Sequence, residues 1–174
     1  YSIKTACKRG SLINEFSNYG KMPSIKKNLA SLSDVMKDLF FLFKETHKNI
    51  NFEMDIDNNI PQFNFDAESM KRAMINLITN SIDAIGDKKD GEIKIKASYQ
   101  PENDCVVITI SDTGIGVKDE YKSRLFEPYF SRKKGGTGLG LYIVYNIVKE
   151  HNGEIRLNEQ KKDGTEFIIT LPVK

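Results

Sequence analysis

The sequence predicts an α/β protein built as a two-layer sandwich, with helices on one face of a mixed sheet. Apolar residues recur with helical spacing over about 33–47, 67–85 and 139–150. Alternating or short apolar runs, typical of strands, lie between and after these segments. The last two predicted strands are joined by a short turn, which favours antiparallel pairing over a doubly wound parallel sheet.

The composition is that of a globular domain with a real core. The chain has 174 residues, of which 39% are hydrophobic and 29% charged. Its net charge of +2 gives no strong reason to expect binding to nucleic acid. Cys7 and Cys105 lack metal-ligand spacing, and Cys105 lies in an apolar run that we expect in the core. No signal peptide and no apolar run of about 20 residues is visible, so we expect a cytoplasmic domain.

The N-terminal third contains two predicted helices and one strand. Residues 1–22 have helical spacing ended by Pro23, and a single amphipathic helix of this kind needs a partner to fold. The second helix spans about 33–47, residues 51–56 alternate like a strand, and Pro61 marks a loop. The broad apolar face of the second helix comprises Val35, Met36, Leu39, Phe40, Leu42 and Phe43.

The helix predicted over 67–85 carries a polar stripe. At 100° per residue, Asn76, Asn80 and Asp83 fall within roughly 60° of one another. This stripe is open to two interpretations, a solvated surface or one side of a ligand site. The opposite side comprises Met70, Met74, Leu77, Ile78, Ile82 and Ile85.

The remaining elements alternate between strands and one helix. Residues 91–99 alternate with a period of two, whereas the continuous apolar run 105–110 predicts a more central strand. The polar, irregular stretch 117–136 predicts a functional loop. The C-terminal part is predicted as a helix and two strands, at 139–150, 154–157 and 166–171.

Two glycine-rich segments suggest a nucleotide site. Residues 112–116, Asp-Thr-Gly-Ile-Gly, place a carboxylate before a sharp turn, where it could accept a hydrogen bond from adenine or simply cap the turn. Residues 136–140, Gly-Thr-Gly-Leu-Gly, precede a helix whose free N–H groups favour phosphate. Neither the P-loop pattern nor GxGxxG spacing is present. Asn80 offers an oxygen suited to Mg²⁺ that phosphates already hold. Together they predict a magnesium-nucleotide site.

Residues 66–171 resemble the catalytic and ATP-binding domain of sensor histidine kinases, in the GHKL (HATPase_c) superfamily with gyrase, Hsp90 and MutL ATPases. The resemblance implies a Bergerat-type ATP-binding fold and a bacterial two-component signalling role. The matching segments are 74–81 (N box), 112–116 (G1), 125–130 (F box) and 136–141 (G2).

The resemblance also implies roles for individual residues. Asn80 would coordinate Mg²⁺, Asp112 would read the adenine amino group, and Thr165 would support the base pocket. Phe126 and Phe130 would anchor the lid over the nucleotide. The full set of implied nucleotide contacts is Asn76, Asn80, Asp83, Asp112, Gly114, Gly116, Arg132, Lys133, Gly136, Thr137, Gly138, Leu139, Gly140 and Thr165.

Residues 14–23 and 126–130 are similar to nitrogen-regulation kinases of the NtrY type. In this interpretation residues 1–24 are the end of the second helix of a dimerisation and phosphotransfer domain, and residues 25–174 are the catalytic domain. The implied partners are that dimerisation domain, an NtrX-like response regulator and a second copy in the full-length homodimer. The full-length protein would be anchored in the inner membrane.

The residues favour phosphoryl transfer over hydrolysis. ATP-hydrolysing relatives have a glutamate as general base where this chain has Asn76, which cannot accept a proton. Only His47 and His151 are present, and neither lies in an acceptor motif, so we expect helix-terminal or surface roles for both. We therefore expect the γ-phosphate of Mg-ATP to go to a histidine upstream of Tyr1 and then to the response regulator, without autophosphorylation by this chain alone. The alternative is a GHKL ATPase or an anti-sigma-type serine kinase.

Overall fold

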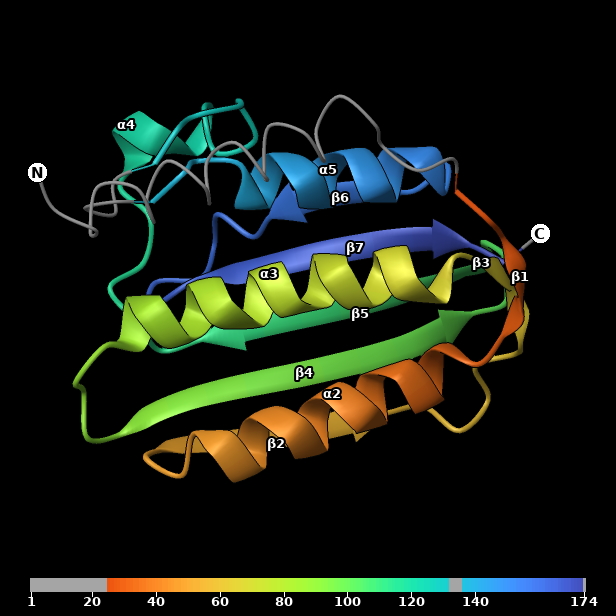
Figure 1. Ribbon diagram of the computed structural model, residues 1–174, viewed down its shortest axis with the longest axis horizontal. Helices are drawn as coiled ribbons and strands as arrows, with labels where there is room; N and C mark the ends of the chain where they lie inside the picture. Colours follow the sequence, from red (N-terminus) through yellow and green to blue (C-terminus); the bar gives the residue numbers. More distant parts are fainter. Residues whose placement is uncertain (1–24, 132–135, 174) are drawn as a thin grey trace, which may run out of the picture.

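A five-stranded mixed sheet carries helices on one face, as Figure 1 shows. The computed structural model describes residues 25–131 and 136–173. The expected two-layer α/β fold is confirmed. The elements are β1 (Asn28–Ala30), α2 (Leu32–Thr46), β2 (Ile50–Ile56), β3 (Phe63–Phe65), α3 (Ala67–Ile85), β4 (Gly91–Gln100), β5 (Cys105–Asp112), α4 (Asp119–Lys122), α5 (Gly140–Glu150), β6 (Glu154–Leu157) and β7 (Glu166–Pro172).

The sheet order is β2-β4-β5-β7-β6, and only the β2–β4 pair is parallel. The helix α3 connects these two strands, as a parallel crossover requires. The strand β5 lies at the centre, as its predominantly apolar run predicted. Consequently the end of β5 at Asp112 is flanked by the start of β4 and the start of β7.

The two faces of the sheet differ because side chains alternate along each strand. On β4, Ile93 and Ile95 are fully buried under the helices, whereas Lys94 and Lys96 point to the opposite face. On that outer face Lys94 pairs with Glu53 at 3.1 Å. These groups are about half exposed, so the pair adds little stability and mainly keeps the face solvated.

The structure adds three short elements that the sequence pattern did not reveal. The strands β1 and β3 form a separate antiparallel pair, and α4 lies inside the stretch 117–136 that was expected to be loop. All three have only three or four residues, too few to establish a period. The helix expected over 1–22 lies outside the described residues, and the boundary at 24/25 stays a prediction.

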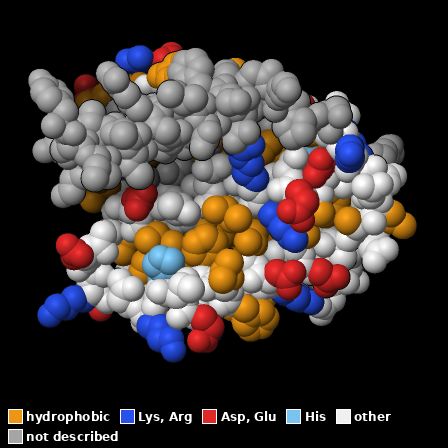
Figure 2. All heavy atoms as spheres, viewed as in Figure 1, with side chains coloured by type: hydrophobic (Ala, Val, Ile, Leu, Met, Phe, Trp, Pro, Cys, Tyr) orange, Lys and Arg blue, Asp and Glu red, His pale blue; other side chains and the backbone are white. Residues whose placement is uncertain are grey.

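Apolar side chains gather on the helical face where α2 and α3 lie, with charged side chains around them (Figure 2). The large exposed ones on these two helices are Phe41, Leu42 and Ile75. Within the described ranges, no helix has both the length and the apolar content that crossing a membrane would need.

Candidate nucleotide-binding site

The helix α3 presents the polar stripe of the N box. Asp66 caps its N-terminus, with a side chain that accepts a hydrogen bond from Ser69 N at 2.9 Å, and Gly86 follows its last residue. Asn76 and Asn80 are half-buried and Asp83 is exposed. The predicted apolar side packs into the core, with Met70, Met74, Leu77, Ile78 and Ile85 buried and Ile82 partly buried.

Asp112 is a buried carboxylate at the end of β5, only 3% exposed. Its Oδ1 atom accepts hydrogen bonds from Gly114 N at 2.9 Å and from Thr165 N at 3.1 Å. Burial raises the pKa of Asp112, while these two bonds, a hydrogen bond with Ser81 and the charge of Lys161 oppose the rise. The carboxylate is therefore held in one orientation before any ligand arrives.

Close backbone packing explains two of the glycines around Asp112. A Cβ atom on Gly114 would lie 2.6 Å from the backbone of Ala84 on α3. Gly164, at φ +84°, would place a Cβ atom 1.9 Å from the carbonyl oxygen of Asp112. The sequence motif identified Gly114 but not Gly164, because this contact joins the end of β5 to the turn before β7, which is distant in the chain.

The G2 segment leads into α5. The helix starts at Gly140 after Leu139, which provides no side-chain cap, so its first N–H groups are available to an anion. A Cβ atom on Gly140 would lie 3.3 Å from Asn76 Oδ1, which places the start of α5 beside the N box. The Thr137 hydroxyl accepts a bond from Leu139 N at 3.4 Å.

The F box packs onto the core beside G2. The ring of Phe126 lies 5.7 Å from that of Tyr145 and 6.2 Å from that of Phe167. Phe130 is also packed against the core. A Cβ atom on Gly138 would lie 2.4 Å from the backbone of Tyr129, so the F box and G2 are in direct backbone contact.

The structure therefore brings together Asp112, Gly114 and Thr165 around one carboxylate, and Asn76 and Gly140 beside one helix start. Gly116, at φ +69°, packs against the Gly164 carbonyl, while Gly136 is exposed. Arg132 and Lys133 lie outside the described residues. Sequence reasoning placed Ser81 in the N box but gave it no role, because nothing in its local pattern reveals the contact with Asp112.

Both histidines lie at helix ends, as expected. His47 follows α2, and its Nδ1 atom lies 2.9 Å from the Thr46 hydroxyl. His151 follows α5 and is buried rather than on the surface. Its Nε2 accepts a hydrogen bond from Asp66 N at 2.9 Å, which ties the end of α5 to the start of α3.

A groove of about 770 Å³ lies next to this site but has a different character. It is formed around the end of α2 and the starts of β2 and β4, and it shares Thr113 with the G1 turn. Its lining includes lysines and acidic residues together, so its charge does not favour a phosphate. The charged lining residues are Lys44, Glu45, Lys48, Lys89, Asp90 and Glu92.

Residues 65–174 match the model of the histidine kinase-, DNA gyrase B- and HSP90-like ATPase family. This chain belongs to that family. It is 34% identical over 166 residues to sporulation kinase E of Bacillus subtilis (strain 168), covering 94% of this chain and 22% of that protein. It is 32% identical over 168 residues to the nitrogen regulation protein NtrY of Azorhizobium caulinodans, covering 95% of this chain and 22% of that protein.

Solved structures agree with this assignment. The catalytic domain of the histidine kinase ThkA matches with a TM-score of 0.75 at 30% identity, covering 85% of this chain and 96% of that chain. A complex of ThkA with the response regulator TrrA matches with a TM-score of 0.79 at 25% identity, covering 98% of this chain and 49% of that chain. The chain spans about a fifth of the curated relatives named above, and NtrY is one of several kinases at similar identity.

Proposed function

We propose that this chain binds Mg-ATP as the catalytic domain of a two-component sensor histidine kinase. The observation that carries the proposal is the buried carboxylate of Asp112, whose orientation is fixed by Gly114 N and Thr165 N. A buried acceptor of fixed direction suits the exocyclic amine of adenine. A ligand without a donor at this place would leave the buried carboxylate oxygen unpaired, which costs binding free energy. Membership of an ATPase family supports the same ligand.

The phosphates would lie at the other end of the site, where α3 and α5 meet. The free N–H groups at Gly140 suit phosphate oxygens, with Asn76 and Asp83 on the neighbouring helix. Among the described residues no cluster of three or more His, Cys, Asp or Glu side chains could hold a metal. Mg²⁺ would therefore be held mainly by phosphate oxygens and water, with the Asn80 amide oxygen as its protein ligand, and would neutralise charge on the phosphates.

Transfer is favoured over hydrolysis by the environment of Asn76. Its Nδ2 atom donates to the Arg72 carbonyl at 3.0 Å, and its Oδ1 atom faces Gly140. An amide in this position has no basicity at neutral pH and cannot activate water. This supports a kinase rather than an ATPase.

The acceptor we propose is a histidine other than the two in this chain. His151 is buried and hydrogen-bonded through both ring nitrogens, and His47 is held at the end of α2. The further partners we propose are a dimerisation domain of the same protein, a homodimer, a membrane anchor and a response regulator. An NtrX-like regulator is the choice that the NtrY-like segments 14–23 and 126–130 favour.

Isothermal titration with ATP and Mg²⁺ tests the proposal. We expect saturable binding that weakens strongly when Mg²⁺ is removed and is lost in Asp112→Ala. Asp163→Ala, at an exposed turn, is the matched control and should bind like wild type. Absence of binding by the wild type would refute the proposal, whereas steady release of inorganic phosphate would favour an ATPase instead. Transfer of label from γ-phosphate to an added phosphotransfer domain would test the kinase step.

A further inference from the structure

We infer that Thr113 is a positioning residue, which together with Lys88 holds Asp112 in its base-reading orientation. The inference rests on the proposed function, because it concerns how the carboxylate that meets the base is held. Thr113 lies between Asp112 and Gly114. Its hydrogen bonds lead to Glu92 on β4 and to Lys88 in the connection between α3 and β4.

Thr113 continues the β4–β5 ladder by one residue beyond its last pair, Ile93 with Asp112. Its backbone N donates to the Glu92 carbonyl at 3.1 Å. In a regular hydrogen-bonded pair the Glu92 N–H would donate to the Thr113 carbonyl in return. Here the Glu92 N–H donates to the Thr113 hydroxyl at 2.9 Å, so a side chain replaces the carbonyl as acceptor.

Because of this replacement, regular pairing with β4 stops at Thr113, and the chain turns there into the G1 segment. The Thr113 carbonyl accepts a hydrogen bond from Lys88 Nζ at 2.8 Å, while the Glu92 N–H donates to the hydroxyl instead. The next residues then reach Ala84, where Ile115 N donates to the Ala84 carbonyl at 3.0 Å. Gly114 N is thereby directed at Asp112 Oδ1, at 2.9 Å.

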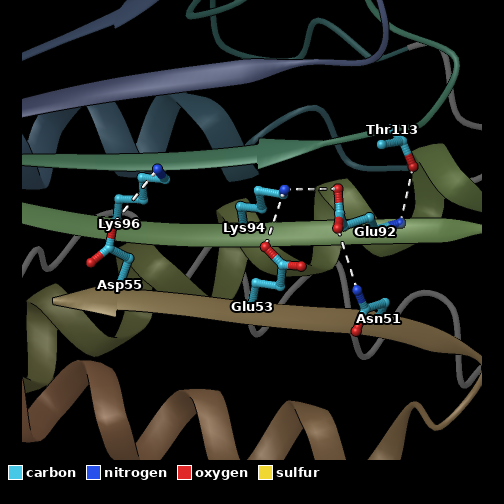
Figure 3. Close-up of polar contacts among 7 residues, drawn as sticks. All are labelled: Asn51, Glu53, Asp55, Glu92, Lys94, Lys96 and Thr113. Atoms are coloured by element: carbon cyan, nitrogen blue, oxygen red, sulfur yellow. Dashed lines mark hydrogen bonds and ion pairs between the residues drawn. The ribbon is translucent and has the colours of Figure 1, made fainter.

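The support for Thr113 extends across the outer face of the sheet. Figure 3 shows Thr113 bonded to Glu92, whose carboxylate in turn contacts Asn51 on β2 and Lys94 on β4. The Lys94 ammonium also bridges to Glu53 at 3.1 Å. The start of β4 is held mainly by its backbone pairing with β2 on one side and β5 on the other, so the Glu92 N–H is a fixed donor for Thr113, and the exposed side-chain contacts add little.

The test compares how well the protein distinguishes ATP from inosine triphosphate, which has an oxygen in place of the exocyclic amine. Dissociation constants of both nucleotides are measured by calorimetry with Mg²⁺. For the wild type we expect a preference for ATP of about 10- to 150-fold, the range for one hydrogen bond to a charged group. In Thr113→Val, which lacks the acceptor, the preference should fall by about three- to tenfold.

Three variants separate positioning from a general loss of stability. Thr113→Ser keeps the hydroxyl and should restore the preference. Thr109→Val makes the same chemical change four residues earlier on β5 and should leave the preference unchanged. Lys88→Met, in an exposed connection, should lower the preference by about two- to fourfold and provides a reading even where Thr113→Val does not fold.

The outcomes are distinguishable. A wild type that binds neither nucleotide, or binds both equally, refutes the proposed function and this inference with it. A wild type that prefers ATP, together with an unchanged preference in Thr113→Val or in Lys88→Met, overturns the inference alone. A reduced preference in both, restored by Thr113→Ser, supports it.

Discussion

Gly164→Ala tests the packing that places β7 against Asp112. Gly164 has φ +84°, and a Cβ atom there would lie 1.9 Å from the Asp112 carbonyl oxygen, whereas real Cβ contacts stay at or above 3.0 Å. Gly86 also has a positive φ, of +56°, but a Cβ atom there would meet nothing closer than 3.9 Å. Gly86→Ala is therefore a control that carries the backbone strain without the overlap.

The expected magnitudes follow from these two geometries. Backbone strain at a positive φ costs about 1–3 kcal/mol, which is the whole effect expected for Gly86→Ala. In Gly164→Ala the overlap adds about 1–3 kcal/mol and forces the strand ends apart. Because Asp112 moves with its carbonyl, the hydrogen bond to the base should be lost, and ATP affinity should fall by at least about tenfold.

Thermal unfolding and ATP titration are measured for both variants. We expect Gly86→Ala to melt a few degrees below wild type, at about 2–4 °C per kcal/mol, and to bind ATP normally. Gly164→Ala should melt lower still and bind ATP weakly at temperatures where it is folded. If Gly164→Ala binds ATP with wild-type affinity and melts together with Gly86→Ala, the reasoning from this contact is wrong.

Three further predictions concern a buried acid, a partly buried aromatic ring and a buried histidine. Since burial raises the pKa of Asp112, its ionisation costs stability as pH rises through that pKa. Asp112→Asn should thus melt at a higher temperature than wild type at pH 7. The difference in melting temperature should disappear below about pH 4, the ordinary pKa of an aspartic acid, and a difference independent of pH would contradict this. Phe126→Ala should lower the free energy of unfolding in urea by about 2–3 kcal/mol, because the ring packs on the core, while the 61% exposed Phe41→Ala should change it little. His151→Ala should cost about 1–3 kcal/mol in the same assay by leaving a backbone N–H unpaired, and an equal cost in His47→Ala would argue against that cause.

Much of the fold could be predicted because its long elements have strong periods. The helix α3 was predicted at the bounds that the structure shows, since buried and polar residues separate cleanly around it. The central place of β5 followed from its continuous apolar run. The strands β1 and β3 were missed because each has only three residues, too few to give a recognisable alternation.

The site could be predicted only where its residues lie in local motifs. Asp112 and Gly114 belong to one short glycine-rich segment, and the structure places them as that segment suggested. Gly164 and Ser81 could not be recognised as neighbours of Asp112 from periodicity, since their contacts depend on how β5, β7 and α3 pack. The role of Thr113 could not be predicted, because it depends on a side-chain hydrogen bond to β4 that no local pattern reveals.

The bond from Thr165 to Asp112 joins residues 53 positions apart, which links ligand binding to folding. The site can form only after β5, β7 and α3 have assembled, so the unfolded chain has no comparable affinity for a nucleotide. Under the proposed function, ATP at 100 times its dissociation constant would stabilise the folded state by about 2.7 kcal/mol. The nucleotide level of the cell would then influence how long this domain survives proteolysis, independently of any phosphate it transfers.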